Sequence, residues 1–583
     1  MYGVSKADKI ASLARRRGFF WPAYEIYGGV GGLYAWGPYG VVLKNKIANL
    51  WREVFVYKHD FVEIQSPDIA PYIVFKASGH VDSFKDVMVS CRECNRKYRA
   101  DTLLKEHGIE IREDLKPSDY EDLIRENDVR CPVCGGELGN ATYFTTMFQT
   151  TIGPYSENKG FLRPETAQGM FTEFKRVYEA MRKRLPIGIA QVGKGFRNEI
   201  SPRQGVIRLR EFDMMELELF YDPSDDKCPY LDDYLDEPIN ILHKEMIERG
   251  DLSGYETMSV KDALDRKIID NSWMAYFMIL SHIFLEMLGI PRTRQRFREK
   301  LAGERAHYAR KTFDQEVYLD KWGWVEVSGH ADRTDYDLSA HLKNSGIDIY
   351  AERRLKEPRY VKEYEVRPRV GDIKRVFGDK VGTIMSRLSK SDVNKLLDSL
   401  KRDGYVFIDD IKLDKKYFDI EVKVKKIESE KFIPHVIEPS FGLDRIAYAT
   451  LEYAYNEKGD RIILSLPAYL APYDAAVYPL LSKDEFIEYA RDLYNELVKS
   501  GYKILFDYGD SIGKLYARGD EIGVPIAFTV DYKTFEDDTV TVRDRDTWLQ
   551  YRIDRGRIQE FIEKILGGIG FEEVAASMKL KLI

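Results

Sequence analysis

The sequence predicts an α+β fold, in which an antiparallel sheet is flanked by helices, together with a separate α/β domain. Apolar residues alternate along two runs within 187–221, and the turn residues between these runs are typical of an antiparallel hairpin with a long loop. Residues 38–58 place apolar side chains at helical spacing. After Pro467, helical and strand patterns alternate over 471–583, a normal size for an α/β domain.

Length and composition bound the class of protein. A chain of 583 residues is too long for one core, so several domains are expected. The net charge of −7 argues against uniform electrostatic capture of nucleic acid, so RNA contacts must come from local basic patches. The most apolar stretch, 273–285, is too short to span a membrane and predicts a buried helix. Since Asp8 interrupts the basic N-terminus, we expect no targeting peptide and a cytoplasmic protein.

Four of the five cysteines form two Cys-x-x-Cys pairs, Cys91 with Cys94 and Cys131 with Cys134. Two such pairs can close a zinc tetrahedron. The alternative is four unligated cysteines, but paired spacing in a chain without a disulfide framework favours a metal. Because four thiolates fill the coordination shell, the predicted zinc is structural rather than catalytic.

The predicted hairpin concentrates charge. Between Lys194 and Arg210 it has five basic residues and one acidic residue, and Glu216 and Glu218 then alternate with apolar neighbours. Carboxylates in register on a strand beside a run of arginines suggest a pocket for a zwitterion and a phosphate. A hairpin with a solvated, charged face explains the same residues, and the residues alone leave both interpretations open.

Three further carboxylates lie in apolar surroundings. Glu165 precedes a predicted helix, Glu326 lies on a predicted strand, and Glu438 lies on another strand that leads into a helix at Leu443. Each is a weak signal alone, because a single glutamate on a strand usually faces water.

Taken together, the motifs resemble the dimeric glycyl-tRNA synthetases of the archaeal and eukaryotic type. The helix at 38–58, the strand after it and Pro67 resemble motif 1 of class II synthetases, residues 196–216 resemble motif 2, and 441–445 resemble motif 3. Segments more specific to the glycine enzymes are 77–82, 98–101, 162–169, 197–211 and 437–442, and 513–523 resembles the anticodon-binding domain. Asp444 stands where glycine is frequent, which puts no catalytic residue in doubt.

The resemblance implies roles for residues around ATP. It implies that Arg197, Arg445 and Glu326 are catalytic, that Phe212 stacks on adenine, and that Glu326 holds Mg²⁺. The implied ATP-binding residues are Arg197, Asn198, Glu199, Arg208, Leu209, Phe212, Glu326, Val327, Gly442 and Arg445.

Glycine offers no side chain to recognise, so the expected pocket binds the ammonium group and fills the space of a Cβ atom. The resemblance implies Glu165, Glu216 and Glu438 as ammonium ligands, with Ser440 closing the pocket. The implied glycine-binding set is Arg99, Glu165, Glu216, Glu438, Pro439 and Ser440.

The resemblance also implies tRNA(Gly) as a substrate and a homodimer built on motif 1. Residues 351–377 have nine Lys/Arg against five Asp/Glu and are expected either to contact the acceptor arm or to form a solvated face. The expected order is catalytic core at 1–79, zinc-binding insertion at 80–160, core at 161–221, mainly helical insertion at 222–310, core at 311–345, insertion at 346–430, core at 431–470 and anticodon-binding domain at 471–583.

Three alternatives remain. The first is another class II synthetase, for threonine, proline, serine or histidine, against which the three glycine-type carboxylates argue. The second is an inactive paralogue that binds nucleic acid, but Arg197 and Arg445 are both retained. The third is a zinc-dependent hydrolase, which needs an open metal position that four cysteines do not leave.

Overall fold

The computed structural model describes residues 5–109, 111, 115–155, 157–202 and 204–583. The chain divides into two compact units, one formed by Met1–Ile349 with Pro434–Ile583 and the other by Tyr350–Ile433. The two units are described separately.

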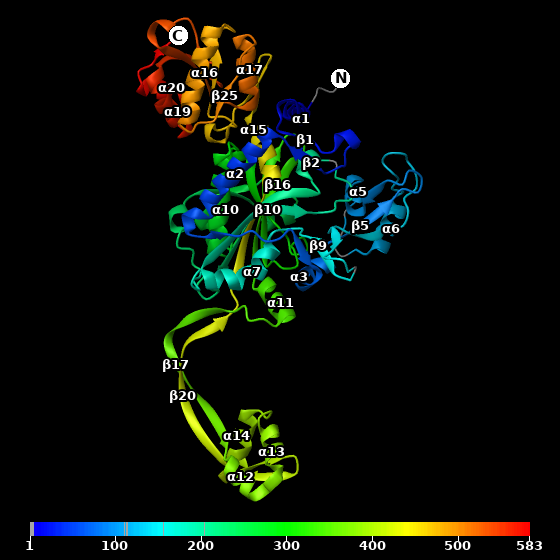
Figure 1. The fold of residues 1–583 in the computed structure, drawn as a ribbon. Coiled ribbons are helices and arrows are strands. Elements are labelled where there is room, and N and C mark those ends of the chain that lie inside the picture. The colour runs from blue at the N-terminus through cyan, green and yellow to red at the C-terminus, as the bar shows by residue number, and fades with distance from the viewer. Residues whose placement is uncertain (1–4, 110, 112–114, 156, 203) are drawn as a thin grey trace. The chain divides into compact units, whose positions relative to one another are not determined.

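A nine-stranded sheet forms the centre of the first unit (Figure 1). Its order is β13-β12-β14-β15-β16-β21-β11-β10-β3, and its strands pair antiparallel except for β10 with β3 and β12 with β14. The strands are β3 (Val62–Glu63), β10 (Ile187–Phe196), β11 (Glu211–Tyr221), β12 (Pro238–Leu242), β13 (Glu256–Ser259), β14 (Gln295–Glu299), β15 (Lys311–Leu319), β16 (Gly323–Thr334) and β21 (His435–Gly442). The predicted antiparallel hairpin is confirmed as β10 and β11.

Helices α2 (Pro38–Phe55), α10 (Ser272–Met287) and α15 (Leu443–Ala454) pack on this sheet and share its main hydrophobic core. Helix α10 is buried around almost its whole circumference, which explains why its sequence is so apolar. Among the described residues, no helix is long and apolar enough to cross a membrane. Helices α7 (Ala167–Ala180) and α11 (Tyr336–Ser345) contact each other, and α7 also packs on β10 and β11.

The segment 222–310, which we expected to be a mainly helical insertion, has more residues in helices than in strands, but its strands join the central sheet. This segment contains α8 (Lys244–Glu248), α9 (Val260–Asp265) and α10, but β12, β13 and β14 also belong to it and extend the central sheet. Their five-residue or shorter runs are too brief for the alternating pattern to stand out beside the long apolar helix.

The register of the central strands brings distant residues onto one face. Glu216 on β11 pairs with Ser440 on β21, and Glu438 on β21 pairs with Ala331 on β16. Since side chains two residues apart on a strand point to the same face, Glu438 and Ser440 lie side by side. The sheet therefore places several polar side chains at one position.

The cysteine pairs belong to a small module beside the central sheet. Its three-stranded sheet has the order β6-β5-β7, with β5 (Lys85–Ser90), β6 (Lys97–Arg99) and β7 (Thr142–Thr145). Helices α5 (Ala100–Glu106) and α6 (Pro117–Glu126) cover it and share a core of their own. We name residues 84–146, which include these elements and the residue on either side of them, the cysteine module. The elements nearby are α3 (Tyr72–Ala77), α4 (His80–Ser83), β4 (Ile69–Pro71), β8 (Gln149–Thr151) and β9 (Lys159–Leu162).

The C-terminal residues form the expected α/β domain. Its sheet has the order β25-β24-β26-β27-β28-β29, with β24 (Ala475–Pro479), β25 (Ile504–Phe506), β26 (Ile526–Val530), β27 (Thr539–Asp544), β28 (Gln550–Asp554) and β29 (Lys581–Leu582). Helices α16 (Asp484–Lys499), α17 (Ile512–Ile522), α19 (Ile558–Leu566) and α20 (Phe571–Ser577) complete the domain. The predicted alternation of helices and strands is confirmed.

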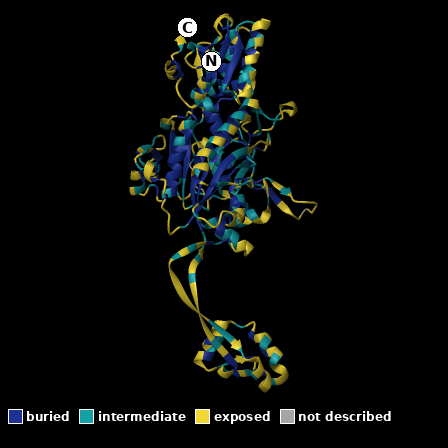
Figure 2. Ribbon diagram, turned by 60° about the vertical axis from the view of Figure 1, so that its left-hand side comes forward, coloured by how far each residue is buried: buried dark blue, intermediate teal, exposed yellow. Residues whose placement is uncertain are grey.

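The second unit consists of a ribbon and a small helical head. The ribbon is the antiparallel pair β17 (Ala351–Pro368) and β20 (Phe418–Phe432), whose side chains are mostly exposed (Figure 2). The head contains α12 (Val370–Phe377), α13 (Val381–Leu388), α14 (Val393–Arg402) and the hairpin β18 (Tyr405–Ile408)–β19 (Ile411–Asp414), around a core of its own.

Candidate active site

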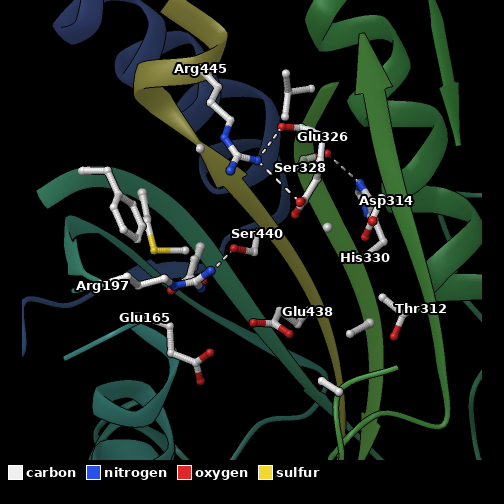
Figure 3. Close-up of a pocket in the computed structure, with 18 of the residues that line it drawn as sticks. Glu165, Arg197, Thr312, Asp314, Glu326, Ser328, His330, Glu438, Ser440 and Arg445 are labelled. Atoms are coloured by element: carbon white, nitrogen blue, oxygen red, sulfur yellow. Dashed lines mark hydrogen bonds and ion pairs between the residues drawn. The ribbon is translucent and has the colours of Figure 1, made fainter. Parts of the chain in front are cut away.

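A cavity of about 430 Å³ opens over β11, β16 and β21 and under the loop between β10 and β11. Figure 3 shows Glu165, Glu438 and Ser440 near the end of the Arg197 side chain, with Arg445 and Glu326 further along the cavity. Most of the expected site residues line it, namely Glu165, Arg197, Glu199, Arg208, Leu209, Phe212, Glu216, Glu326, Val327, Glu438, Ser440, Gly442 and Arg445.

Three expected residues do not belong to this lining as far as the described chain goes. The Arg99 guanidinium is held by Asp101 at 2.7 Å and lies 3.5 Å from Asp86, on the cysteine module. The backbone of Pro439 lies on β21 between two cavity residues, so its ring faces away from them. Asn198 follows Arg197 in the loop and is also outside the lining.

Glu216 is buried at the floor of the cavity and already oriented. One of its carboxylate oxygens accepts a hydrogen bond of 2.6 Å from the backbone N–H of Thr166, and the other accepts one of 2.6 Å from the hydroxyl of Ser440. Burial raises the pKa of Glu216, and the nearby Glu165 raises it further. A cationic group entering the cavity would relieve both effects.

Glu165 lies opposite, in an environment that favours its charged form. Burial alone would raise the pKa of this carboxyl, but His80 and Arg333 hold it well below its ordinary value. His80 Nε2 lies 3.2 Å from Glu165 Oε1, and the Nδ1 atom of the same ring lies 2.8 Å from the hydroxyl of Ser78. The imidazole therefore lies beside the carboxylate, without a hydrogen bond from Nε2 within the described part of the chain.

Arg333 is the residue at the centre of this acidic group that the sequence did not reveal. Its guanidinium is fully buried, lies 3.0 Å from Glu438 and 2.8 Å from Asp337, and stacks over the ring of Tyr308 at 3.7 Å. In the sequence it lies between aspartates near the end of a strand, which is typical of a surface turn. Only the tertiary fold distinguishes it from an exposed arginine.

Glu438 is the least stabilised of the three expected ammonium ligands. Burial raises its pKa to about 8, the ion pair with Arg333 opposes that shift, and Glu165 and Glu216 add to it. Behind it, both carboxylate oxygens of Glu218 are buried without a hydrogen-bond partner within the described part of the chain, and burial raises the pKa of this group well above its ordinary value. The acidic end thus contains more carboxyl groups than cations to pair with them.

Arg197 enters the cavity from the end of β10, between two aromatic rings. Its guanidinium carbon lies 5.5 Å from the centre of the Phe212 ring and 5.7 Å from that of Phe84, and its Nε atom donates to the backbone carbonyl of Pro164 at 3.2 Å. The remaining N–H groups are available to an anion in the cavity, and a planar guanidinium suits carboxylate and phosphate oxygens.

Arg445 enters from the first turn of α15. It donates to the backbone carbonyls of Ile207 at 2.9 Å and Glu326 at 2.7 Å, and its guanidinium lies 3.4 Å from the Glu326 carboxylate. Arg208 is paired with Glu199 at 2.6 Å at the cavity rim. These contacts fix both arginines before any ligand binds.

A second carboxylate faces Glu326 from the neighbouring strand. Asp314 on β15 pairs with Lys300 at 2.9 Å, and both residues line the cavity. Burial raises the pKa of Asp314 to about 7, and the charge of Glu326 adds to this shift. The sequence indicated neither residue, because a Lys just after β14 and an Asp on β15 have no recognisable spacing. Two carboxylates beside a polyphosphate suit Mg²⁺, which prefers oxygen ligands and keeps several waters.

Asp444, the departure from the family pattern, is a structural residue. Its buried carboxylate pairs with Lys44 of α2 and accepts a hydrogen bond of 2.6 Å from the backbone N–H of Asp213. It thereby ties α15 to α2 and to β11, next to the cavity wall.

The four paired cysteines converge at one end of the cysteine module. Their sulfur atoms all lie within 4.8 Å of one another, with 3.5 Å between Cys91 and Cys134 and 3.7 Å between Cys94 and Cys131. All four are free thiols. A zinc tetrahedron with 2.3 Å bonds has sulfur–sulfur edges of about 3.8 Å, so the geometry and the donor set fit this ion.

Comparison with known proteins assigns the fold and the family. Residues 150–454 match the family model described as tRNA synthetase class II core domain (G, H, P, S and T), and 474–565 match the anticodon binding domain. The prolyl-tRNA synthetase of Cryptosporidium parvum superposes with a TM-score of 0.52 at 13% identity, covering 99% of this chain and 78% of that chain, which supports the fold.

Curated relatives match over nearly the whole length. Proteins named glycine–tRNA ligase are 44% identical in Aeropyrum pernix, over 98% of this chain and 99% of the relative, and 42% identical in Pyrococcus furiosus, over 97% and 99%. The relative from Methanocaldococcus jannaschii is 41% identical over 96% of this chain and 99% of its own. With its class II core and anticodon-binding domain, the chain belongs to the glycine–tRNA ligase family.

Proposed function

We propose that the chain activates glycine with ATP in the cavity of its first unit and then transfers the glycyl group to the 3′ end of tRNA(Gly). The observation that carries this proposal is the convergence of Glu165, Glu216 and Glu438 on one end of a cavity whose other parts hold Arg197 and Arg445. Carboxylates suit an ammonium group, and guanidiniums suit carboxylate and phosphate oxygens. A small zwitterion beside a nucleotide satisfies both sets.

In the first step, the glycine carboxylate attacks the α-phosphate of ATP and pyrophosphate leaves. The nucleophile belongs to the substrate, so the protein supplies position and positive charge rather than a general base. Arg197 braces the glycine carboxylate and the α-phosphate, whereas Arg445 and Arg208 hold the rest of the triphosphate. Phe212 stacks on adenine, and Glu199 and the backbone of Leu209 contact its edge.

Selectivity for glycine rests on the acidic end of the cavity. The ammonium group binds between Glu165, Glu216 and Glu438, each of which already contacts a neighbouring group. Ser440 is fixed by its hydrogen bond to Glu216 and fills the space that a Cβ atom of a larger amino acid would need. A larger substrate is rejected by overlap, which costs more free energy than a missing methylene would.

In the second step, the 3′-hydroxyl of the terminal adenosine attacks the carbonyl carbon of the adenylate and AMP leaves. The C-terminal domain binds the anticodon, although 471–583 contain 15 Lys/Arg and 21 Asp/Glu; unpaired bases can be read by stacking and edge hydrogen bonds without a basic surface. The basic stretch 351–377 of the second unit contacts the acceptor arm.

Two metal ions belong to the proposal, one in the cavity and one in the cysteine module. Glu326, with Asp314 on the adjacent strand, would hold Mg²⁺, which neutralises charge on the triphosphate. The sulfur atoms of Cys91, Cys94, Cys131 and Cys134 would hold a zinc ion that stabilises the cysteine module.

We further propose a cytoplasmic homodimer built on the motif 1 elements, α2 and β3. The domain assignment follows the expected boundaries, except that 222–310 joins the catalytic core through β12, β13 and β14.

The experiment that tests the function is ATP–pyrophosphate exchange with a panel of amino acids. We expect exchange with glycine and less than about one hundredth of that rate with alanine, serine, threonine, proline or histidine. Faster exchange with another member of the panel would assign the chain to a different specificity. Absence of exchange with every amino acid would favour an accessory nucleic-acid-binding protein.

A further inference from the structure

Phe84 lies where the start of β5, the end of β10 and helix α4 meet. Its ring faces the guanidinium of Arg197 at 5.7 Å and stacks on His80 with 4.9 Å between ring centres. Nε2 of His80 in turn lies 3.2 Å from the Glu165 carboxylate. Phe84 immediately precedes β5 and is half-buried. This one aromatic side chain of the cysteine module therefore contacts both Arg197 and His80, the neighbour of Glu165.

A second contact joins the same module to the same loop. The backbone N–H of Asn198, the residue after Arg197, donates to the carbonyl of Thr146 at 2.6 Å. Thr146 directly follows β7, and its own backbone N–H donates to the carbonyl of Phe84 at 3.1 Å. The ends of β5 and β7 therefore hold the start of the loop between β10 and β11 from one side.

The opposite end of this strand pair holds the cysteines. Strands β5 and β7 pair from Lys85 with Thr145 to Met88 with Thr142, and Cys91 comes just after β5 and bridges to Leu138. Since a strand rises about 3.3 Å per residue, the six residues of β5 extend roughly 20 Å between Phe84 and Cys91, and the first four of them pair with β7. Because backbone hydrogen bonds hold the two strands in register, a shift of the chain at the cysteines also displaces Phe84 and Thr146 at the other end of the strands.

We propose that Phe84 is a positioning residue that fixes the guanidinium of Arg197, and that β5 and β7 make this fixation depend on metal occupancy of the four cysteines. The inference rests on the proposed roles of Arg197 and of the cysteine cluster. Arginine held over an aromatic face loses rotamer freedom before the substrate arrives, so less entropy is lost on reaching the transition state. Thr146 fixes the backbone next to it in the same way.

The first test replaces the ring. We expect Phe84→Leu to lower kcat of glycine-dependent pyrophosphate exchange by about tenfold, the middle of the range for a cation–π contact, with KM for ATP changed less than about twofold. Phe84→Tyr keeps the aromatic face and should stay within about twofold of the wild type. Tyr143→Leu, on the exposed side of β7, is the matched control and should leave kcat unchanged.

If Phe84 acted only through packing, Phe84→Leu would lower the melting temperature, and the loss of kcat would not depend on whether the replacement is aromatic. We therefore expect Phe84→Leu to melt within about 2 °C of the wild type. Full kcat in Phe84→Leu would overturn the positioning role, and so would an equal loss in Phe84→Tyr.

The second test removes the metal from the full-length protein with a chelator and measures zinc release with a chromophoric indicator. We expect about one zinc per chain in the wild type and in Phe84→Leu. Removal should lower wild-type kcat by about tenfold, reversibly on adding zinc, and should lower kcat of Phe84→Leu little further, because both changes act through the same contact. Equal fold losses in both proteins would overturn the dependence on the cysteine cluster.

The outcomes of these experiments distinguish failure of this inference from failure of the proposed roles of Arg197 and the cysteine cluster. A wild-type protein without zinc would overturn the metal assignment and the dependence on occupancy, while the leucine and tyrosine variants would still decide the role of Phe84. An Arg197→Lys variant with full kcat would overturn the proposed role of the arginine itself.

Discussion

The guanidinium of Arg333 lies 3.0 Å from the carboxylate of Glu438; both residues are buried, and Glu438 lines the cavity. The same guanidinium also reaches Asp337 and Glu165, so one cation serves three acids. This pairing leaves the acidic end of the cavity with more carboxyl groups than cations, which favours the proposal that a small cation binds there.

Arg333→Met should damage both stability and glycine binding. It leaves the buried Asp337 and Glu438 without their cation, and removing one partner of a buried ion pair typically costs about 3–5 kcal/mol. We expect a lower midpoint of urea unfolding, followed by tryptophan fluorescence. Arg333→Lys keeps the charge but loses the planar fork and the stacking on Tyr308, so KM for glycine should rise at least about tenfold. The exposed pair of Arg15 with Glu25 provides the control, and Arg15→Met should change neither quantity.

The affinity for glycine should depend on pH through Glu438, whose pKa burial raises to about 8. Below that pH the free enzyme holds a proton on this carboxyl, and the ammonium group must displace it. KM for glycine should therefore fall as pH rises towards 8, by up to about tenfold per unit, and level off above it. Measured between about pH 6.5 and 8.5, Glu438→Gln should give a high KM without this slope. A wild-type KM that is flat over this range would contradict the assignment.

Ser440→Gly should relax the rejection of alanine. The substitution removes the side chain that lies against Glu216 and opens space where a substrate methyl group can fit. We expect alanine-dependent exchange to increase at least about tenfold relative to glycine-dependent exchange, because overlap rather than missing contacts excludes alanine. Ser440→Thr, which adds a methyl group, should lower both activities. An unchanged ratio in the glycine variant would mean that another residue closes the pocket.

Asp314→Asn should weaken the interaction with Mg²⁺. The substitution removes the negative charge beside Glu326 and leaves Lys300 without its partner. We expect a several-fold higher Mg²⁺ concentration for half-maximal exchange at fixed ATP, since Mg²⁺ is held by one or two carboxylates together with phosphate oxygens. Asp320→Asn, at the exposed end of the same hairpin, should leave the Mg²⁺ requirement unchanged.

The sequence predicted the helices and strands that form the site better than it predicted the contacts between their side chains. The hairpin of β10 and β11 and the strand β21 before α15 have alternating patterns, and the motif residues fall on them at recognisable spacings; the helix α10 followed from its apolar composition. The cysteine cluster followed from paired spacing alone.

The sequence did not indicate the residues whose surroundings depend on tertiary contacts. These residues have no distinctive neighbours in sequence, and they acquire their surroundings only when strands far apart in the chain pair; they are Arg333, Asp314, Lys300 and Phe84. The short strands of 222–310 were missed for a related reason, since each is too brief to show a period by itself. Arg99 was expected at the substrate because of its motif, whereas Asp101 and Asp86 hold it on the cysteine module.

The most direct test of the glycine pocket is Glu216→Gln, measured by glycine-dependent ATP–pyrophosphate exchange. The substitution keeps the shape of the side chain, removes the charge that would face the ammonium group and replaces one of its two acceptor oxygens with an amide NH₂ group. We expect kcat/KM for glycine to fall at least about thirtyfold with KM for ATP nearly unchanged, as for other buried charge pairs that lose one partner. Exchange within about twofold of the wild type would contradict the proposal that these carboxylates bind the substrate ammonium.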